Sequence, residues 1–353
     1  MKATAPTPAD TEQSPAAGVE GGSTASTPRR KNPLSAVLGQ DYLGVAIAIV
    51  ALVLFIGAFH PRFLEADQLA SVLGNAAYIG VLACGMAFLL AMRELDLSVG
   101  SIFAVSALAC ATIIQAGINP WIAAILTLGV GAVLGLNNAL LIRVVALPSI
   151  VATLATLALY RGFGLAFSEG RQIIGAPLDH SFTKIIGGSV LGVPFPGLML
   201  IVVVVILTII LRLTTFGYRV RSIGSNPEAA EFSGIPVHRV RTQAFVLTGL
   251  LGGLAGVLSV GYLGSADPNT GTGYELQAIA AAVIGGTALA GGRATVIGAA
   301  LGAILLGVVG TGLAYFRVPI QWNQFALGAV ILLAVTLDSF VRSRRRRSSR
   351  PAL

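Results

Sequence analysis

The side chains that most often carry catalysis or bind metals are few in this sequence, and they are scattered along it. Its three histidines, at positions 60, 180 and 238, lie at the end of a long apolar stretch or outside these stretches, whereas Cys84 and Cys110 lie inside them. No histidine or second cysteine stands at the spacing of a zinc site, and two separated cysteines make no disulfide framework. The sequence therefore predicts neither a metal centre nor a membrane-embedded hydrolase, and no residue is assigned a catalytic role.

A nucleotide-binding P-loop needs a lysine followed by serine or threonine after a glycine-rich turn. The lysines of this chain are Lys2, Lys31 and Lys184, and they are followed by alanine, asparagine and isoleucine. The chain is therefore predicted to carry no ATPase motif of its own. We expect it to be no enzyme and to bind no cofactor.

Carboxylates that could relay protons in an ion-coupled carrier stand at the ends of apolar stretches. They are Glu94, Asp96, Glu275 and Asp338. Asp338 is expected at the membrane interface beside the basic C-terminal segment, and a cytoplasmic turn is the commonest setting for Glu94 and Asp96. The two Asn-Pro pairs are followed by Trp121 and Glu228, not by the alanine of a water-channel motif.

A polar segment over 212–241 carries the clearest local helix signal. Asn226 suits an N-cap, Pro227 the first helical position and Gly234 the end of the helix. This pattern predicts a short helix over 227–233 on the cytoplasmic face. Its predicted apolar surface, which suits docking into a groove of another protein, is rimmed by Glu228 and Glu231 and consists of Ala229, Ala230 and Phe232.

The elements that must position these residues are predicted to be membrane helices. Only 11% of the 353 residues are Asp, Glu, Lys or Arg, against about 25% in soluble domains. Hydrophobic residues make up 55%, and the mean hydropathy is +0.84. So few charges cannot cover a soluble protein of this size, which argues against an aqueous enzyme or a nucleic-acid-binding protein.

A helix needs about 20 apolar residues to cross the hydrocarbon core of a bilayer. Stretches without a formal charge cover 42–61, 68–92, 97–142, 144–160, 185–211, 242–266, 276–292, 294–316 and 318–337. The turn sequence at 117–121 divides 97–142 into two, so the fold is predicted to be all-α and polytopic, with about 10 transmembrane helices. The short stretches 144–160 and 276–292 are candidates for broken or re-entrant helices.

The ends of the chain differ from its centre. Residues 1–33 are predicted to be a disordered cytoplasmic tail, 40–341 the transmembrane domain, and 342–353 a basic cytoplasmic tail. With ten crossings and the N-terminus inside, 18 of the 23 basic residues face the cytoplasm, as the positive-inside rule expects. We therefore expect a multi-pass protein of the cell (inner or plasma) membrane with both termini cytoplasmic.

Small residues recur at helical spacing and predict a closely packed bundle. The pairs are Gly131 with Gly135, Gly252 with Gly256, and Gly298 with Gly302. Segments 75–105 and 276–305 share a glycine-broken apolar pattern followed by a polar turn, which suggests an internal repeat.

Four blocks of the sequence match one family in order. They are Leu-Asp-Leu-Ser-Val-Gly-Ser at 95–101, Pro-Ser-Ile-Val-Ala-Thr-Leu at 148–154 with Tyr-Arg-Gly at 160–162, Glu-Ala-Ala at 228–230 with Gly234, and the run from Gly271 to Arg293. Together they resemble the permease subunits of bacterial ATP-binding-cassette (ABC) importers, in the ribose-type branch that includes xylose, arabinose and galactose systems. Arg93 and Glu94 depart from the family, which usually has small residues there, and Gln277 replaces a frequent acidic residue.

The resemblance implies an importer of several subunits. This permease would pair with a second permease copy, in a homodimer or heterodimer, and with cytoplasmic ATP-binding subunits that use the ATP. An extracytoplasmic sugar-binding protein would deliver the substrate, membrane lipid would surround the helices, and no nucleic acid would bind. The ATPase-coupling role would fall to Asn226, Pro227, Glu228, Ala229, Ala230, Phe232 and Gly234.

A sugar pathway needs only a weakly polar lining. The candidates are Asn75, Asp96, Ser98, Asn137, Asn138, Thr153, Thr156, Tyr274, Glu275, Gln277 and Thr287. For the polar residues of the spans, a hydrogen bond between helices is an equally good explanation. Tyr274 and Glu275 are expected to face the outside, where they would touch the binding protein or gate the sugar.

Two classes of function remain open from the sequence. The first is an ABC permease for a monosaccharide such as ribose, xylose or galactose, with a nucleoside, inositol or autoinducer-type sugar as alternative substrates. The second is a self-sufficient secondary carrier or facilitator for a small polar solute. An ATPase that co-purifies with the chain would favour the first class, and transport in ATP-free liposomes the second.

Overall fold

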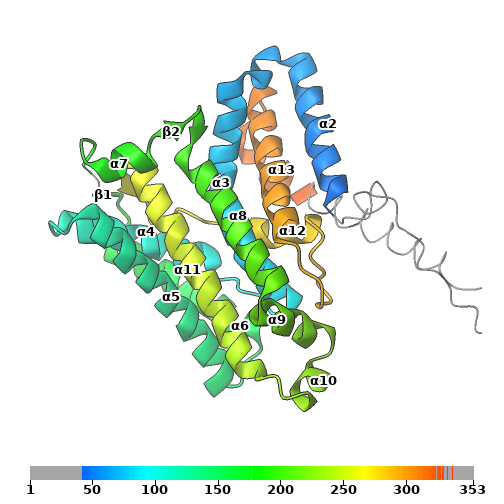
Figure 1. Cartoon of the computed structure of the whole chain (residues 1–353). Helices are drawn as coiled ribbons and strands as arrows, with labels where there is room; N and C mark the ends of the chain where they lie inside the picture. The colour runs from blue at the N-terminus through cyan, green and yellow to red at the C-terminus, as the bar shows by residue number, and fades with distance from the viewer. Residues whose placement is uncertain are drawn as a thin grey trace, which may run out of the picture. The chain divides into compact units, whose positions relative to one another are not determined.

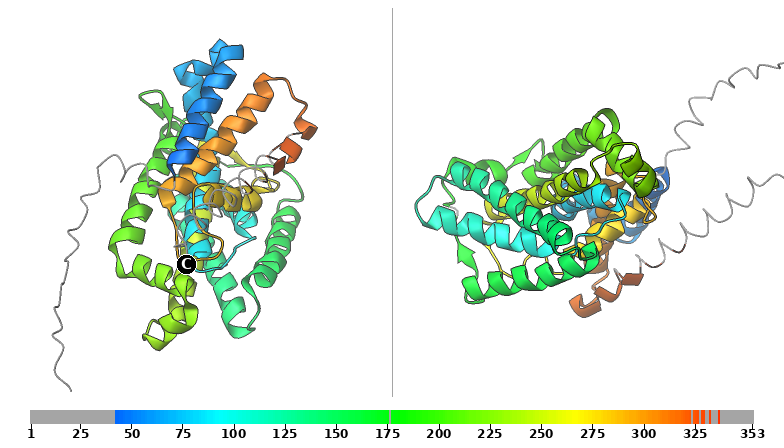
Figure 2. Two further views of the ribbon diagram at one scale, coloured as in Figure 1. Left: turned by 90° about the vertical axis from the view of Figure 1, so that its right-hand side faces the viewer. Right: turned by 90° about the horizontal axis from the view of Figure 1, so that it is seen from below.

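A computed structural model describes residues 42–175, 177–322, 324–326, 328, 329, 332 and 336. Most of these residues are helical, which confirms the predicted all-α fold, as Figure 1 and the two further views in Figure 2 show. The predicted tails at 1–33 and 342–353 lie outside the described residues, as do Asp338 and much of the predicted span 318–337.

The first half of the described chain is a run of long helices. Their bounds are α2 Leu43–Phe59, the 3-10 helix η1 Pro61–Leu64, α3 Ala66–Ala91, α4 Val99–Gln115, α5 Pro120–Val144 and α6 Ser149–Phe167. The turn before α5 divides the stretch 97–142 into two helices, as predicted. The Asn119 side chain caps α5 by accepting a hydrogen bond from the Trp121 amide at 2.9 Å, and Pro120 occupies the first turn.

The second half alternates long helices with short elements. Their bounds are β1 Ile173–Ile174, α7 Ser181–Ile186, β2 Ser189–Val190, β3 Val193–Pro194, α8 Phe195–Leu213, α9 Thr215–Ser225, α10 Pro227–Phe232, α11 Val237–Leu263, β4 Ser265–Ala266, α12 Tyr274–Ile284, α13 Val296–Tyr315 and η2 Ile320–Trp322. Strand β1 pairs antiparallel with β4, and β2 with β3 as a hairpin. The hairpin and α10 lie at opposite ends of the long helices (Figure 1), and these ends are named below the hairpin end and the α10 end.

The predicted membrane segments are present as helices. Six helices, α3, α5, α6, α8, α11 and α13, are long and apolar enough to cross a membrane, and α2, α4 and α12 are shorter apolar helices. Each predicted segment before residue 318 therefore contains one helix. This agreement confirms a polytopic all-α membrane protein.

The two short predicted stretches have different outcomes. Helix α6 does not stop at 160 but continues past Arg161 to Phe167, because the Arg161 side chain donates hydrogen bonds to the carbonyl oxygens of Pro268 and Thr270 at 2.9 Å each. Helix α12 has 11 residues, so at 1.5 Å per residue it is about 16 Å long. It is therefore too short to cross a membrane alone, as expected for a broken helix.

Helices α4 and α12 begin beside each other, at half the length of α3. The Tyr274 ring stacks on Phe103 with 5.9 Å between centroids, and Phe103 stacks on Tyr78 with 6.1 Å. Gly100 of α4 packs against the Gly271 carbonyl oxygen so closely that a Cβ would not fit. Each of the two helices follows an irregular segment, which is tolerated at this depth because it is buried in protein.

A long helix followed by an irregular segment and a shorter helix occurs twice, as α3 with α4 and as α11 with α12. The internal repeat predicted between 75–105 and 276–305 does not match these two helix pairs. The first segment begins within the 26-residue α3, whereas the second begins in the short α12. The apolar pattern alone does not distinguish a long helix from a short one continued by a buried loop.

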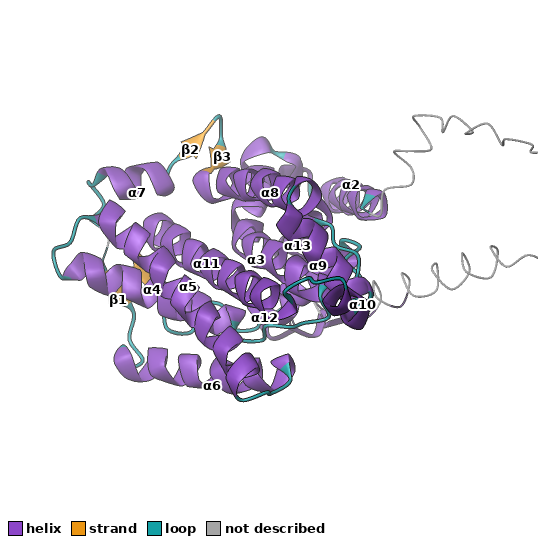
Figure 3. Cartoon of the chain, turned by 60° about the horizontal axis from the view of Figure 1, so that its bottom comes forward, coloured by secondary structure: helices purple, strands orange, loops and turns teal. Residues whose placement is uncertain are grey.

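Close helix packing centres on α11, which contacts α3, α4 and α5 and lies between α5 and α3 in Figure 3. The predicted glycine pairs all lie at helix contacts: Gly131 and Gly135 of α5 on α11, Gly252 and Gly256 of α11 on α4, and Gly298 and Gly302 of α13 on α12. In lipid, the hydrophobic effect does not drive helices together. Small residues let the helix backbones approach closely, and the resulting van der Waals packing stabilises the bundle.

Gly131→Ala is expected to destabilise the protein by about 1–3 kcal/mol, because the new methyl group would overlap the Gly249 carbonyl oxygen of α11. Gly129→Ala, two residues earlier on α5, is the matched control, since nothing lies within 4 Å of its Cβ position. Alanine there is expected to be neutral or slightly stabilising. Thermal unfolding of both variants in one detergent tests this difference, and equal midpoints would contradict it.

Candidate functional site

The predicted cytoplasmic helix is present as α10, over Pro227–Phe232, and ends one residue earlier than expected. The Asn226 side chain caps it by accepting a hydrogen bond from the Ala229 amide at 3.0 Å, with proline in the first turn. After the helix, Gly234 has φ +78°, a left-handed conformation that glycine adopts without strain. The capping residues thus predicted both ends of this element.

Helix α10 exposes part of its predicted apolar surface. Phe232 is 94% exposed, and Glu228 and Ala229 are exposed as well. Ala230 is only 5% exposed, so its prediction as an exposed surface residue is wrong. At 3.6 residues per turn, Ala230 points away from Phe232 and packs inward. We name Glu228, Ala229 and Phe232 the α10 surface; an exposed aromatic ring outside the apolar spans is typical of a contact surface.

Helix α9, which leads into α10, is fixed to the end of α3. Gly224 lies so close to the Ala91 carbonyl oxygen that a Cβ would not fit. Arg93 donates hydrogen bonds from Nε to the Gly224 carbonyl at 2.9 Å and from Nη2 to the Ser225 carbonyl at 3.1 Å. A cation at the carbonyl end of a helix also interacts favourably with the helix dipole. Arg93 therefore holds α9 in place.

Glu94 extends this attachment to α11. Its Oε1 atom lies 2.7 Å from Nε of Arg241, and the two side chains are 10% and 29% exposed. Arg93 and Glu94 are the positions at which the sequence departs from the family pattern. Here they join the start of segment 95–98 to α9 and α11, and we name them the Arg93–Glu94 anchor.

Asp96 lies two residues beyond this anchor and is fully buried beside the start of α4. Its Oδ1 atom accepts hydrogen bonds from the amide and hydroxyl of Ser98 at 2.9 and 2.7 Å, and from Nδ2 of Asn138 at 3.3 Å. Asn138 also donates to the Ser98 hydroxyl oxygen at 2.7 Å. Burial of a carboxyl group requires such donors, so these contacts fix the start of α4 against α5.

The network continues to α6. The Tyr160 hydroxyl donates to Oδ1 of Asn138 at 3.2 Å and accepts from Nδ2 of Asn137 at 2.8 Å. The Thr153 hydroxyl lies 3.4 Å from the carbonyl oxygen of Leu95, which connects α6 to segment 95–98. Polar side chains from three separate parts of the chain therefore form one group, here named the Asp96 cluster.

The Asp96 cluster contains five predicted pathway residues, namely Asp96, Ser98, Asn137, Asn138 and Thr153. All of them except Asn137 are 0% exposed, so those four line no open passage in this structure. Thr156 is equally buried and donates to the Thr153 carbonyl at 3.2 Å. In this conformation these residues serve the alternative role considered for them, hydrogen bonding that holds helices and segment 95–98 together.

Tyr274 and Glu275 are half-buried at the start of α12, and the Tyr274 ring stacks on Phe103 of α4. That they face the outside stays a prediction. A Cβ on Gly100 would meet Oε2 of Glu275. This buried oxygen has no hydrogen-bond partner in the described part of the chain.

The remaining pathway candidates are dispersed. Asn75 is exposed on α3 between buried neighbours, and Gln277 is half-buried on α12. Thr287 lies in the loop after α12, is 1% exposed and accepts a hydrogen bond from the Thr295 amide at 3.3 Å. Thr287 therefore braces this loop and does not join the other candidates.

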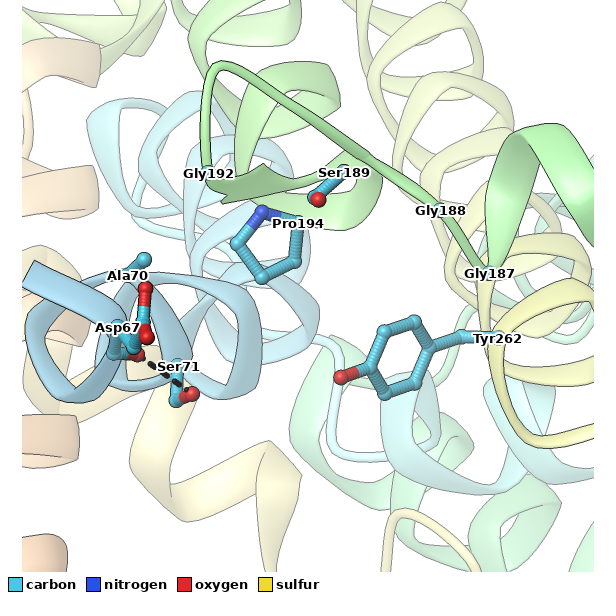
Figure 4. A pocket seen from close by; sticks show the side chains of 9 residues that line it. All are labelled: Asp67, Ala70, Ser71, Gly187, Gly188, Ser189, Gly192, Pro194 and Tyr262. Carbon is cyan, nitrogen blue, oxygen red and sulfur yellow. Dashed lines mark hydrogen bonds between the residues drawn. The ribbon is translucent and has the colours of Figure 1, made fainter.

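A cavity of about 310 Å³ lies at the hairpin end (Figure 4). Four polar side chains line it: Asp67 and Ser71 of α3, Ser189 of β2 and Tyr262 of α11. The rest of its lining consists of Ala70, Gly187, Gly188, Gly192 and Pro194. None of these was among the residues predicted from the sequence. The available signal was the four-residue spacing of Asp67 and Ser71 at the start of an apolar helix.

Membrane-length helices, two shorter apolar helices (α4 and α12) that begin beside each other within the bundle and an exposed helix outside the spans define a polytopic membrane transport protein. Comparison with known families gives the particular type. The chain belongs to the family described as branched-chain amino acid transport system, permease component, which matches residues 68–335.

Its relatives include permeases named for the import of ribose and of autoinducer 2. The ribose import permease protein RbsC of Bacillus subtilis (strain 168) is 39% identical over 296 residues, which cover 84% of this chain and 92% of the relative. The autoinducer 2 import system permease protein LsrC of Salmonella typhi is 35% identical over 304 residues, with 86% and 87% covered. RbsC of Haemophilus influenzae is 31% identical over 301 residues, with 85% and 93% covered. The resemblance to ribose-type permeases is thus confirmed, and no solved structure matches the chain.

Proposed function

We propose that this chain is the membrane-spanning subunit of an ABC importer for a monosaccharide or an autoinducer-type sugar. Relatives named for the import of ribose and of autoinducer 2 support these two substrate classes. The observation that carries the proposal is the α10 surface, with Phe232 94% exposed on a capped helix outside the spans. A self-sufficient carrier has no use for such a docking helix.

The proposed partners follow from the two ends of the bundle. A cytoplasmic ATP-binding subunit would dock on the α10 surface, and both chain termini would lie in the cytoplasm as well. An extracytoplasmic binding protein would deliver the sugar at the hairpin end, where the cavity lies. A second permease copy, identical or different, would complete the pathway.

A continuous set of contacts supports a route for the coupling. Force on α10 passes directly to α9, because only Asn226 separates the two helices. From α9 it reaches the Arg93–Glu94 anchor through the two hydrogen bonds of Arg93. Asp96 lies two residues after the anchor and is hydrogen-bonded to Ser98 at the start of α4 and to Asn138 of α5. ATP-driven movement of α10 would in this way shift the broken helix α4.

The test is purification of the complex from native membranes, followed by ATPase and uptake measurements in proteoliposomes. We expect an ATP-binding subunit to co-purify, and its activity to rise with a binding protein loaded with ribose, xylose, galactose or autoinducer 2. The sugar that stimulates hydrolysis identifies the substrate. Sugar movement by this chain alone in ATP-free liposomes would instead establish a carrier.

A further inference from the structure

We infer that the cavity at the hairpin end is the first binding subsite of the permease for a neutral, polyhydroxylated solute, and that one face of α3 leads from it to Tyr78. The inference rests on the proposed function and specifies the ligand chemistry and the residues that meet it. This face consists of Asp67, Ser71 and Asn75, and is named the α3 polar face.

The cavity lining selects for hydroxyl groups. The hydroxyls of Ser189 and Tyr262 extend into the space between the hairpin, α3 and α11 (Figure 4). Ser71 donates to the Asp67 carbonyl oxygen at 2.8 Å, which leaves its own oxygen lone pairs as acceptors. About 310 Å³ lies within the range of small-molecule sites.

Charge narrows the ligand class further. Among the described residues that line the cavity, the ionisable groups are the Asp67 carboxyl and the Tyr262 phenol, and there is no lysine or arginine. A sugar phosphate would bring an anionic group without a cationic partner, and would face the carboxylate of Asp67. A neutral sugar has hydroxyl groups that can donate hydrogen bonds to this carboxylate.

The α3 polar face continues from the cavity into the bundle. Asp67, Ser71 and Asn75 are four residues apart and all exposed, on a helix whose most apolar part is 83% buried. Residues at this spacing lie on one side of a helix, and Tyr78, three residues further, belongs to the same side. The exposed face therefore leads from the cavity to Tyr78.

Tyr78 is a buried side chain whose hydroxyl is available to form a hydrogen bond with a ligand. Its side chain is 9% exposed, and its hydroxyl has no hydrogen-bond partner in the described part of the chain. A buried hydroxyl without a partner is unfavourable, so a sugar hydroxyl that bonds to it is favoured. The phenol groups of Tyr262, in the cavity, and of Tyr274, at the start of α12, are near enough to interact electrostatically with it. Tyr78 thus lies between the cavity and the place where α4 and α12 begin beside each other.

Thiol labelling of the purified permease tests the subsite directly. The two native cysteines, Cys84 and Cys110, are both 0% exposed, so introduced cysteines can be labelled in the natural background. We expect Ser71→Cys and Asn75→Cys to react with a hydrophilic thiol reagent. Ribose, xylose or galactose is expected to slow the reaction at both positions.

The control variant is Leu178→Cys, 78% exposed on a loop outside the cavity, whose labelling should not depend on sugar. Ribose 5-phosphate is expected to protect none of the three variants, because of its charge. The inference is overturned if no neutral sugar protects Ser71→Cys and Asn75→Cys, or if ribose 5-phosphate protects them as well as ribose does.

Tyr78→Phe tests the deeper position in the complete transport complex. It removes the hydroxyl but keeps the ring that stacks on Phe103. We expect the sugar imported per ATP to fall about fivefold, the loss of one hydrogen bond, while ATP hydrolysis stimulated by the loaded binding protein stays at the wild-type level. Tyr42→Phe, before α2, removes a phenol outside this route and is expected to change neither quantity.

Unchanged import per ATP in Tyr78→Phe would overturn the role of Tyr78. Failure of the proposed function looks different, because the wild-type complex would then show no ATP hydrolysis in response to a loaded binding protein. In that case the labelling of the permease alone still decides whether the cavity binds sugar.

Discussion

Glu228→Gln is expected to abolish ATP-dependent sugar uptake while the protein still inserts and folds. Glu228 is exposed in the first turn of α10 and forms no ion pair within the described part of the chain, so its carboxylate is free for a partner protein. Loss of one member of a charge pair at an interface costs about 2 kcal/mol or more, which corresponds to at least a roughly 30-fold loss. Uptake into vesicles and ATPase activity of the purified complex measure this loss.

The same change should matter little for folding. Asn226 still caps α10, and the charge itself contributes about 0.3–1 kcal/mol through the helix dipole. Glu231→Gln is the matched control, because it neutralises the same charge on the same helix at a position between Ala230 and Gly234 that is not among the residues of the Glu-Ala-Ala and glycine match. Wild-type uptake in Glu228→Gln, or an equal loss in Glu231→Gln, would refute the docking role of Glu228.

Local signals made α10 and the helix boundary at Asn119 predictable from the sequence. Caps depend on residues within one turn, so Asn226, Pro227 and Gly234 determine α10 wherever the rest of the chain lies. The inward position of Ala230 was not predictable in this way. It depends on tertiary contacts, which decide which side of the helix faces the protein.

Helices α4 and α12 show what an apolar pattern cannot predict, namely where a helix begins within an uncharged stretch. Hydropathy indicates which residues avoid water, but the uncharged stretch 276–292 contains both most of α12 and the loop that follows it. Glycines near the start of α12 were visible in the sequence, whereas the start of α12 at Tyr274 depends on packing against Gly100 and Phe103. The half-buried positions of Tyr274 and Glu275 therefore could not be predicted from the apolar pattern.

For the polar sites as well, the sequence predicted individual residues but not which of them lie together. Asp96, Asn138 and Thr153 were selected as polar residues of apolar segments, but their hydrogen bonds join residues 42 and 58 positions apart. Pairing at that separation requires the packing of three segments. The cavity at the hairpin end combines α3, α11 and a loop in the same way, and no motif marks its residues.

Arg241→Gln is expected to destabilise the protein more than the double variant Glu94→Gln/Arg241→Gln. Without the arginine, the Glu94 carboxylate, 10% exposed, loses the opposite charge at 2.7 Å. Breaking a buried pair in this way costs about 3 kcal/mol, the lower end of the usual range because Arg241 is 29% exposed. The double variant removes both charges and leaves a neutral, polar amide side chain at each position. Thermal unfolding in detergent compares the two variants, and Arg239→Gln, exposed two residues earlier on α11, is the control.

The double variant also tests what the Arg93–Glu94 anchor does. If the anchor transmits movement of α9 to segment 95–98, a folded protein without the ion pair should still dock its ATPase. The sugar moved per ATP should nevertheless fall, because the link between α11 and the start of this segment is weakened. The expected loss is about fivefold, the effect of roughly 1 kcal/mol in one charge-assisted contact.

The pattern across variants separates docking from transmission. Glu228→Gln should lose both stimulated ATP hydrolysis and uptake, because the ATPase no longer docks on the α10 surface. The double anchor variant should keep hydrolysis and lose only the sugar moved per ATP, because its defect lies between α11 and the start of segment 95–98. If the double variant unfolds at the same temperature as Arg241→Gln, the ion pair is not the source of the stability. If it transports as much sugar per ATP as the wild type, coupling does not run through Glu94, and Arg93 alone would have to connect α9 to the Asp96 cluster.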